Sequence, residues 1–256
     1  MSGAKEIVVK PISRNDANRI VRVIHYSKGV VNNSQIHLGV FLGEKCGGVM
    51  QFGPSIDKRK MLGLVKGTKW NGFLELNRMA FADWLPRNSE SRAIAFAMRW
   101  VRKKYPQIRW VVSFADACQC GDGTIYRASG FVLTGINKNK TIWKLADGTI
   151  TTDISIRLRK GNIAKSKGAS SMKAFKDAGA YLLSGFQLRY IFFVDPKARG
   201  DLAVPEIGFD RIAKVGAGMF RGKPRAGSDP ATRQQSHAGK GGAAPTPALM
   251  LECGDD

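Results

Sequence analysis

The chain contains few acidic residues for its length, so its charge is strongly unbalanced. Its 256 residues include 20 Asp and Glu against 41 Lys and Arg, which gives a formal net charge of +21. Such an excess favours a polyanionic partner, because each phosphate contact releases counterions. A solubilising basic surface or an anionic membrane is the alternative interpretation. The sequence has no signal peptide and no apolar run long enough to span a bilayer, so we expect a cytoplasmic protein without membrane segments.

Cysteine is also scarce, and its spacing excludes two classes of site. The four cysteines are Cys46, Cys118, Cys120 and Cys253, and none of them forms a C-x-x-C pair. This argues against a disulfide framework and against a structural zinc site, and it fits a reducing compartment. A covalent role for Cys118 or Cys120 would require a base partner, so we expect structural thiols at both positions.

A glycine-rich G-x-G-x-x-G turn after a strand is missing too, which argues against a doubly wound dinucleotide-binding sheet. Periodicity instead predicts strands, hairpins and helices in alternation. The expected strands are 6–12, 36–42, 47–52, 73–81, 109–114, 131–133, 141–145, 149–157 and 188–194, and the expected helices are 15–24, 89–105, 124–128 and 172–183. Because the hairpins are antiparallel, we expect an α/β fold with a mixed sheet flanked by helices.

Composition divides the chain into three parts. Residues 1–160 contain the predicted catalytic core, and residues 161–215 form a basic extension whose helix and strand pack on that core. Residues 216–256 are rich in Gly, Ala, Pro and Ser, a composition typical of disorder.

The segment 111–131, VVSFADACQCGDGTIYRASGF, is the first candidate for a functional site. It predicts a buried strand, a loop with Asp116, a short helix with Tyr126 and a glycine turn into another strand. Ligands of open α/β sheets bind at such strand ends. We therefore expect Asp116 and Tyr126 to face a ligand.

Several motifs together resemble known families. The strand-helix-strand order of 73–131 and the Y-x-x-x-G-F pattern of 126–131 are similar to the GNAT fold of N-acetyltransferases. A more specific set resembles the Mom family of bacteriophage proteins, over about residues 20–160 and the strand LRYIFFVD. The motifs are HYS at 25–27, LGVF at 38–41, LELNRM at 74–79, NSESR at 88–92, SFAD at 113–116 and GTIYRASGF at 123–131.

The resemblance implies a transferase encoded by a phage and acting in the cytoplasm of the bacterial host. The family converts adenine in DNA to N6-carbamoylmethyladenine, which protects phage DNA from host restriction endonucleases. The matching residues implied as catalytic are His25, Tyr26, Arg78, Asp116 and Tyr126.

Each implied residue has a chemical and a structural interpretation. Asp116 could accept a hydrogen bond from the N6 amine or cap a turn, and Tyr126 could act as a general acid or only pack its helix. Arg78 could fix the donor or form an internal ion pair. His25 could be a base, a metal ligand or a satisfied structural histidine, and Tyr26 could stack on an extruded base. His25, Tyr26 and Asp116, with Tyr126, could bind a metal such as iron if they converge.

Donor binding is predicted at the start of the helix that follows Pro86. Asn88, Ser89 and Ser91 lie there, and free amides at a helix start can bind a phosphate, although simple capping explains the same residues. The pyrophosphate loop of ordinary acetyltransferases, Q/R-x-x-G-x-G/A, is missing. The donor could therefore be acetyl-CoA or a glycine-derived donor such as glycyl-tRNA.

DNA binding is predicted in the basic loop between residues 54 and 71 and in segment 157–176. Backbone contacts are expected there, and Trp70, Phe73 and Trp84 could stack or wedge. The loop residues expected to contact DNA are Lys58, Arg59, Lys60, Lys66, Lys69 and Trp70. The expected partner is double-stranded DNA, with tRNA and a second copy of the chain as further candidates.

Two other functions fit the same sequence. One is a conventional acetyl-CoA-dependent N-acetyltransferase acting on an amine or tRNA. The other is a non-catalytic DNA-binding protein on an acyltransferase scaffold. The missing pyrophosphate loop argues against the first, and the polar residues Arg78, Asp116 and Tyr126 at strand positions argue against the second.

Overall fold

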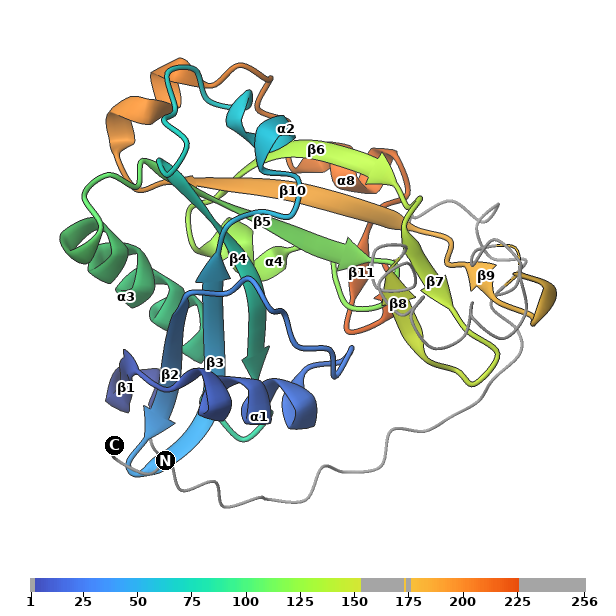
Figure 1. The fold of residues 1–256 in the computed structure, drawn as a ribbon, viewed down its shortest axis with the longest axis horizontal. Coiled ribbons are helices and arrows are strands. Elements are labelled where there is room, and N and C mark those ends of the chain that lie inside the picture. Colours follow the sequence, from blue (N-terminus) through green and yellow to red (C-terminus); the bar gives the residue numbers. More distant parts are fainter. Residues whose placement is uncertain (1–2, 153–172, 174–175, 226–256) are drawn as a thin grey trace.

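The computed structural model describes residues 3–152, 173 and 176–225, and a seven-stranded sheet forms its centre (Figure 1). The strand order is β1-β2-β3-β4-β5-β10-β6, and every neighbouring pair is antiparallel except β4 and β5. The strands are β1 (Ile7–Pro11), β2 (Ile36–Leu42), β3 (Lys45–Gly53), β4 (Phe73–Phe81), β5 (Trp110–Ala117), β6 (Val132–Lys138) and β10 (Phe186–Phe193). The predicted mixed sheet flanked by helices is confirmed.

Helices cover both faces of this sheet. The helical elements are η1 (Ala4–Glu6), α1 (Arg14–Ile24), α2 (Lys58–Leu62), α3 (Ser89–Lys104), α4 (Thr124–Ala128), η3 (Pro196–Asp201) and α8 (Asp210–Lys214). On one face α3 buries Ile94 and Met98 against Met50 and Phe52. On the other face α1 buries its apolar side, including Ile20, against β2, β3 and β4. A second cluster, around Trp110, continues that face beneath α2 and η3.

Smaller sheets lie beside the central one. A three-stranded sheet contains β7 (Ile142–Lys144), β8 (Ile150–Thr152) and β9 (Tyr181–Leu182), in the order β8-β7-β9. A hairpin of β11 (Met219–Phe220) and β12 (Lys223–Pro224) packs near α4 through the buried carboxylate of Asp122. No helix in the described ranges is long and apolar enough to cross a membrane.

Three expectations about elements need correction. The helix predicted at 172–183 is wrong at its end, because β9 pairs there with β7. The predicted loop 54–71 contains the short helix α2, capped by Asp57. The strand predicted to pack on the core, β10, lies inside the sheet between β5 and β6, where its apolar residues are buried on both faces.

Folded elements continue beyond residue 216, where the tail was expected to begin. The β11–β12 hairpin extends the folded chain to residue 225, beyond the boundary expected at 216, because Asp122 holds it to the core. The boundary at 160, most of segment 157–176 and residues 226–256 lie outside the described residues. The division into a core, an extension and a tail stays a prediction.

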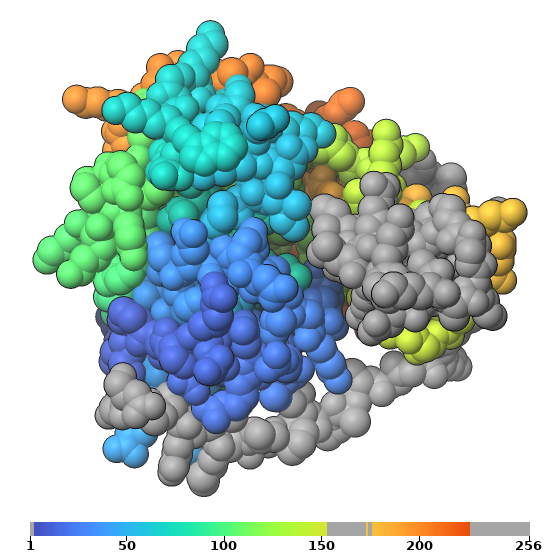
Figure 2. Space-filling model, in the orientation of Figure 1, coloured from blue at the N-terminus to red at the C-terminus, as the bar shows by residue number. Residues whose placement is uncertain are grey.

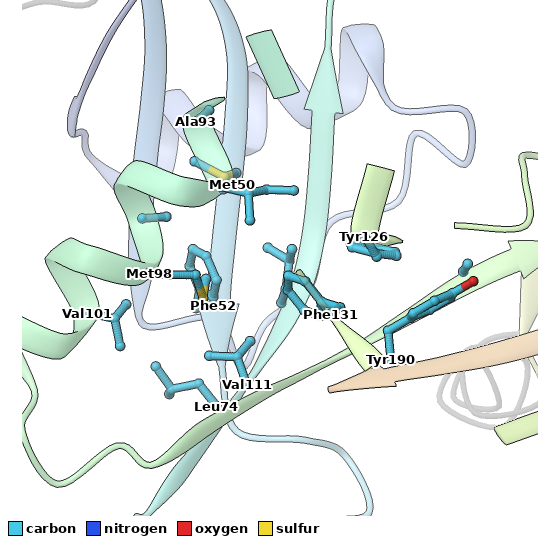
Figure 3. Close-up of a cluster of buried hydrophobic side chains, with 14 of the residues drawn as sticks. Met50, Phe52, Leu74, Ala93, Met98, Val101, Val111, Tyr126, Phe131 and Tyr190 are labelled. Atoms are coloured by element: carbon cyan, nitrogen blue, oxygen red, sulfur yellow. The ribbon is translucent and has the colours of Figure 1, made fainter. Parts of the chain in front are cut away.

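The parallel pair at the centre of the sheet is short. Only Phe73–Glu75 of β4 pair with Trp110–Val112 of β5, and the two strands then diverge (Figure 3). After the divergence, β4 has a bulge at Asn77. Gln51 and Phe52 are adjacent in β3, but they pair with Arg78 and Leu76 of β4, so Asn77 has no partner in the register. We call this region, where β4 leaves β5, the splay. It frees one edge of β5 from Ser113 onward, so side chains there are not fully enclosed by a neighbouring strand.

Gly123 connects the end of the β5 loop to α4 and offers a test of this packing. Its φ is +82°, and a Cβ at this position would lie against the Tyr190 ring, 2.7 Å from Cζ. Gly123→Ala should lower the free energy of unfolding by about 2–5 kcal/mol, from the left-handed backbone and the clash together. Gly148→Ala is the matched control, because its φ is +80° with nothing within 4 Å. In urea denaturation, the control should lower the free energy of unfolding by about 1–2 kcal/mol. An equal decrease in both variants would refute the clash with Tyr190.

Candidate active site

A carboxylate and a tyrosine distant in sequence meet on the face of β5 that carries Asp116. The Tyr26 hydroxyl donates to Oδ2 of Asp116 at 3.0 Å, which joins the end of α1 to the end of β5. The backbone N–H of Cys118 donates to Oδ1 at 2.9 Å, and Nε2 of Gln119 donates to Oδ2 at 3.3 Å. Asp116 therefore organises its own turn, as the structural interpretation expected, and also orients Tyr26.

Burial is the main cause of the pKa shifts of Asp116 and Tyr26. It raises the pKa of Asp116 above its usual range, although the hydrogen bonds from Cys118 and Tyr26 oppose the rise. Burial of the hydroxyl end and then the charge of Asp116 raise the pKa of Tyr26 well above 10, while 49% of the residue's surface stays exposed. Tyr26 is thus a neutral donor at physiological pH, and Asp116 is a carboxylate whose basicity is increased.

His25 stacks on Tyr26, with ring centroids 4.4 Å apart. Its Nδ1 accepts the backbone N–H of Ser27 at 3.1 Å, so the neutral ring carries its proton on Nε2. Burial, and then the charge of Arg78, lower the pKa of His25 to about 4. Nδ1 is thus already occupied, and Nε2–H is a hydrogen-bond donor rather than a base.

Arg78 approaches the same cluster from β4. Its Nε donates to the Gly29 carbonyl at 2.9 Å and its Nη1 donates to the Asn77 carbonyl at 2.8 Å. Within the described part of the chain it forms no salt bridge, so the internal ion pair with Asp116 is not made. Burial lowers the pKa of Arg78, opposed by Tyr26 and Glu75. A guanidinium anchored by carbonyl oxygens keeps its charge available to an anion or a donor carbonyl.

Tyr126 lies on the other side of β5. It is 8% exposed and packs against Phe131 and Tyr190 in the main core, as Figure 3 shows. Burial raises its pKa to about 12, with smaller effects from Ser113, Cys120 and Glu75. The chain reaches Tyr126 from Asp116 through a short loop, in which the backbone N–H of Cys120 donates to the Asp116 carbonyl at 2.9 Å before α4 begins. Tyr126 is therefore protonated and packed in the core, on the face of β5 opposite to Asp116.

Glu75 is a charged residue of the site that the sequence analysis missed. It ends the parallel pairing of β4 with β5 and pairs with Val112. Burial raises the pKa of Glu75, while Ser55, Asn77 and Arg78 oppose the rise. An acid inside the apolar strand FLELNRMAF was the available signal, because a buried charge requires partners.

The structure also bears on the predicted roles of the cysteines and of a bound metal. Burial and the nearby Asp116 raise the pKa of both Cys118 and Cys120, so neither thiol is activated. Among the residues that the structure describes, no group of three or more His, Cys, Asp or Glu is placed to bind a metal. His25, Tyr26 and Asp116 do come together, but Nδ1 of His25 is turned to Ser27, and a metal there stays a prediction.

The predicted donor site lies at the start of α3. Asn88 has a left-handed backbone and no side-chain cap, and the hydroxyl of buried Ser89 donates to the Pro86 carbonyl at 2.6 Å. Ser91 donates to the Asn88 carbonyl at 3.2 Å. In the described ranges no hydrogen bond joins these residues to Tyr26 or Asp116, and their donor role stays a prediction.

The predicted DNA-binding residues lie on the loop 54–72 and α2, which project at one end of the face in Figure 2. Lys58 lies over the Trp70 ring, 4.7 Å from its centroid, and Trp70 is 53% exposed. Arg59, Lys60, Lys66 and Lys69 are exposed. Trp84 is exposed near β3, whereas Phe73 is buried and stacked on Trp110, so its predicted role as a wedge is wrong.

Comparison with known proteins identifies the family. A model described as the Mom protein family matches residues 6–210. The chain belongs to the Mom family. Methylcarbamoylase mom of Escherichia phage Mu, a Mom-family relative, is 39% identical over 199 residues, which cover 77% of this chain and 79% of the relative.

Solved structures with a similar fold are more distant. FeeM, an N-acyl amino acid synthase from uncultured soil microbes, is 15% identical with a TM-score of 0.44, covering 77% of this chain and 95% of its own. A GNAT family acetyltransferase from Elizabethkingia anophelis is 11% identical with a TM-score of 0.42, covering 73% and 98%. Beside these, the Mom relative is much closer in sequence.

His25 should make stability depend on pH. Its folded pKa of about 4 lies below the ordinary 6.5, so its neutral form is favoured in the fold. The resulting stability is present above pH 6.5 and is lost as the pH falls towards 4, by about 3 kcal/mol. His25→Gln should remove most of this loss when urea unfolding is measured from pH 7 to 4. His37→Gln, at a half-buried ring, should change it less, and an unaltered pH dependence in His25→Gln would contradict the burial of neutral His25.

Proposed function

We propose that this chain transfers a carbamoylmethyl group to the N6 amine of adenine in DNA, inside the bacterial host. The modification would shield phage DNA from host restriction endonucleases. Membership of the Mom family, with a phage relative named methylcarbamoylase, carries the proposal. The net charge of +21 supports DNA as the substrate, because the acceptor is a polyanion.

The site supplies what this acceptor chemistry needs. Adenine N6 is a weak nucleophile, because its lone pair is delocalised into the ring. Asp116 has a raised pKa and faces Tyr26 at the splay, so it is suited to accept a proton of the amine. As the N6–carbon bond forms and the bond to the leaving group breaks, one N6 proton moves toward Asp116. Tyr126, which the raised pKa keeps protonated, is the residue proposed to give a proton to the leaving group.

Arg78 and His25 support the same step. The Arg78 guanidinium holds positive charge near Tyr26 and Glu75, where a donor carbonyl or an anionic leaving group would be stabilised. The Nε2–H of His25 is a second donor of hydrogen bonds. A glycine-derived donor such as glycyl-tRNA matches the product in composition: the tRNA hydroxyl leaves, and the N6-glycyl group that forms is an isomer of carbamoylmethyl, so a rearrangement without any oxidant completes the product. Acetyl-CoA alone lacks the amide nitrogen, and its acetyl group would give N6-acetyladenine. Asn88, Ser89 and Ser91 remain the proposed donor-binding residues, and iron at His25, Tyr26 and Asp116 remains a further proposal.

Modification should depend on Asp116 and Tyr126. Asp116→Asn and Tyr126→Phe should each lower the modified fraction of deoxyadenosine about 10²- to 10⁴-fold, since each removes a proton-transfer group. The measurement is mass spectrometry of nucleosides from cells expressing each variant, with DNA binding unchanged. Asp83→Asn, at an exposed carboxylate, and Tyr105→Phe, at a half-buried ring, are the matched controls. Acetylated nucleoside instead would indicate a conventional acetyltransferase, and unmodified DNA with folded wild-type protein would sink the proposal.

DNA affinity should fall steeply with salt. Arg59→Gln with Lys60→Gln should reduce the slope of log K against log salt by about 0.9 for each phosphate that the protein no longer neutralises. Lys103→Gln with Lys104→Gln, two adjacent exposed lysines at the end of α3, is the matched control and should leave the slope unchanged. The measurement is fluorescence anisotropy with a labelled duplex from low to moderate salt. A flat response of the wild type would contradict phosphate-driven binding.

A further inference from the structure

One aromatic side chain of β5 is exposed although the strand lies inside the sheet. On β5, Trp110 and the next three residues are each 0% exposed, yet Phe114 is 41% exposed. It is also two residues from Asp116, and side chains two apart on a strand point to the same face. The splay explains the exposure, because β4 pairs with β5 only as far as Val112.

The neighbours of Phe114 leave its ring uncovered. Arg189 pairs with it on β10, but the guanidinium turns to β6, donating to Thr134 Oγ1 at 3.0 Å and to its carbonyl at 2.8 Å. Among the described residues, no ring stacking or cation–π contact involves Phe114. Single exposed apolar residues are common on surfaces, so position decides the interpretation. This one stands beside the site carboxylate.

A second exposed aromatic ring completes the arrangement. Tyr26 is 49% exposed and reaches Asp116 with its hydroxyl, so two rings flank one carboxylate. Side chains at i and i+2 of a strand are about 7 Å apart, which is comparable with the length of a purine. A purine lying on the Phe114 ring would therefore present its edge to Asp116.

We propose that Phe114 is the stacking platform for the adenine extruded from DNA, with the exocyclic amine directed at Asp116. The proposal rests on adenine in DNA as the substrate. Enzymes that modify a base take it out of the helix, and stacking on an aromatic ring offsets part of the lost base stacking. Tyr26 borders the same space but is held by Asp116, whereas Phe114 has no such partner among the described residues.

The test separates extrusion from binding and needs no donor. Each variant is bound to the same duplex, one strand of which carries a single adenine. The thymine opposite that adenine is then probed with permanganate, which attacks unpaired thymine. Phe114→Ala should lower thymine reactivity and the modified fraction in cells about 5- to 100-fold, the range expected for one stacked base. Overall DNA affinity should change less than about threefold, because backbone contacts supply it.

The controls make each outcome decisive. Phe114→Trp should retain extrusion, and Phe209→Ala, which removes a ring of the same 41% exposure at the start of α8, should change neither readout. Normal thymine reactivity and modification in Phe114→Ala would overturn the platform. Lost modification with normal thymine reactivity would also overturn it, because Phe114 would then serve the donor. If wild-type protein extrudes the base but leaves DNA unmodified, the proposed function fails while the platform stands.

Discussion

The early separation of β4 from β5 is the constraint on which the rest of the site depends. Parallel pairing ends at Glu75 and Val112, and the bulge at Asn77 turns the remainder of β4 toward β3. The central strand of a sheet normally buries every residue between two neighbours. Here β5 continues beyond its partner, so Asp116 can be polar at the middle of the sheet and still be reached from outside.

Burying ionisable groups around the splay costs folding stability. Because the protein keeps them there, a functional role is favoured over a structural one. Burial raises the pKa of Asp116 and Glu75 and lowers that of His25 and Arg78. In each case burial disfavours the charged form. Hydrogen bonds or opposite charges partly offset this effect at Asp116, Glu75 and Arg78, whereas at His25 the charge of Arg78 adds to it. A purely structural network would neutralise its charges in ion pairs, but Arg78 is held by two carbonyl oxygens. Proteins keep such unfavourable arrangements where chemistry requires them.

Much of the fold could be predicted from the sequence, because local signals agreed with the final structure. Alternation predicted β4 with its bounds, and helical periodicity predicted α1 to within one residue at its start. The central place of β10 could not be predicted, since an apolar strand is consistent with any buried position and its neighbours are distant in sequence. The helix expected over 172–183 ended early because pairing with β7 outweighed local propensity.

The residues of the site could be predicted from sequence motifs, but residue spacing alone does not show that they meet. HYS and SFAD are 90 residues apart at Tyr26 and Asp116, and only the fold places the two in contact. Glu75 and Phe114 were inside quoted motifs yet were interpreted as strand residues. Alternation cannot reveal that a strand loses its neighbour part-way along, which is what exposes Phe114 and gives Glu75 its place at the splay.

The two tyrosines implied as catalytic lie on opposite faces of β5. Tyr26 approaches β5 from the open face with Asp116, whereas Tyr126 approaches from the core face beside Ser113. Side chains of a strand alternate between faces, so the sheet separates these groups. The loop after β5 joins the two faces, because the Cys120 N–H donates to the Asp116 carbonyl at 2.9 Å and the chain then enters α4, which carries Tyr126. A base that approaches the open face therefore meets Tyr26 and Asp116, whereas Tyr126 is enclosed by Phe131 and Tyr190 on the core face.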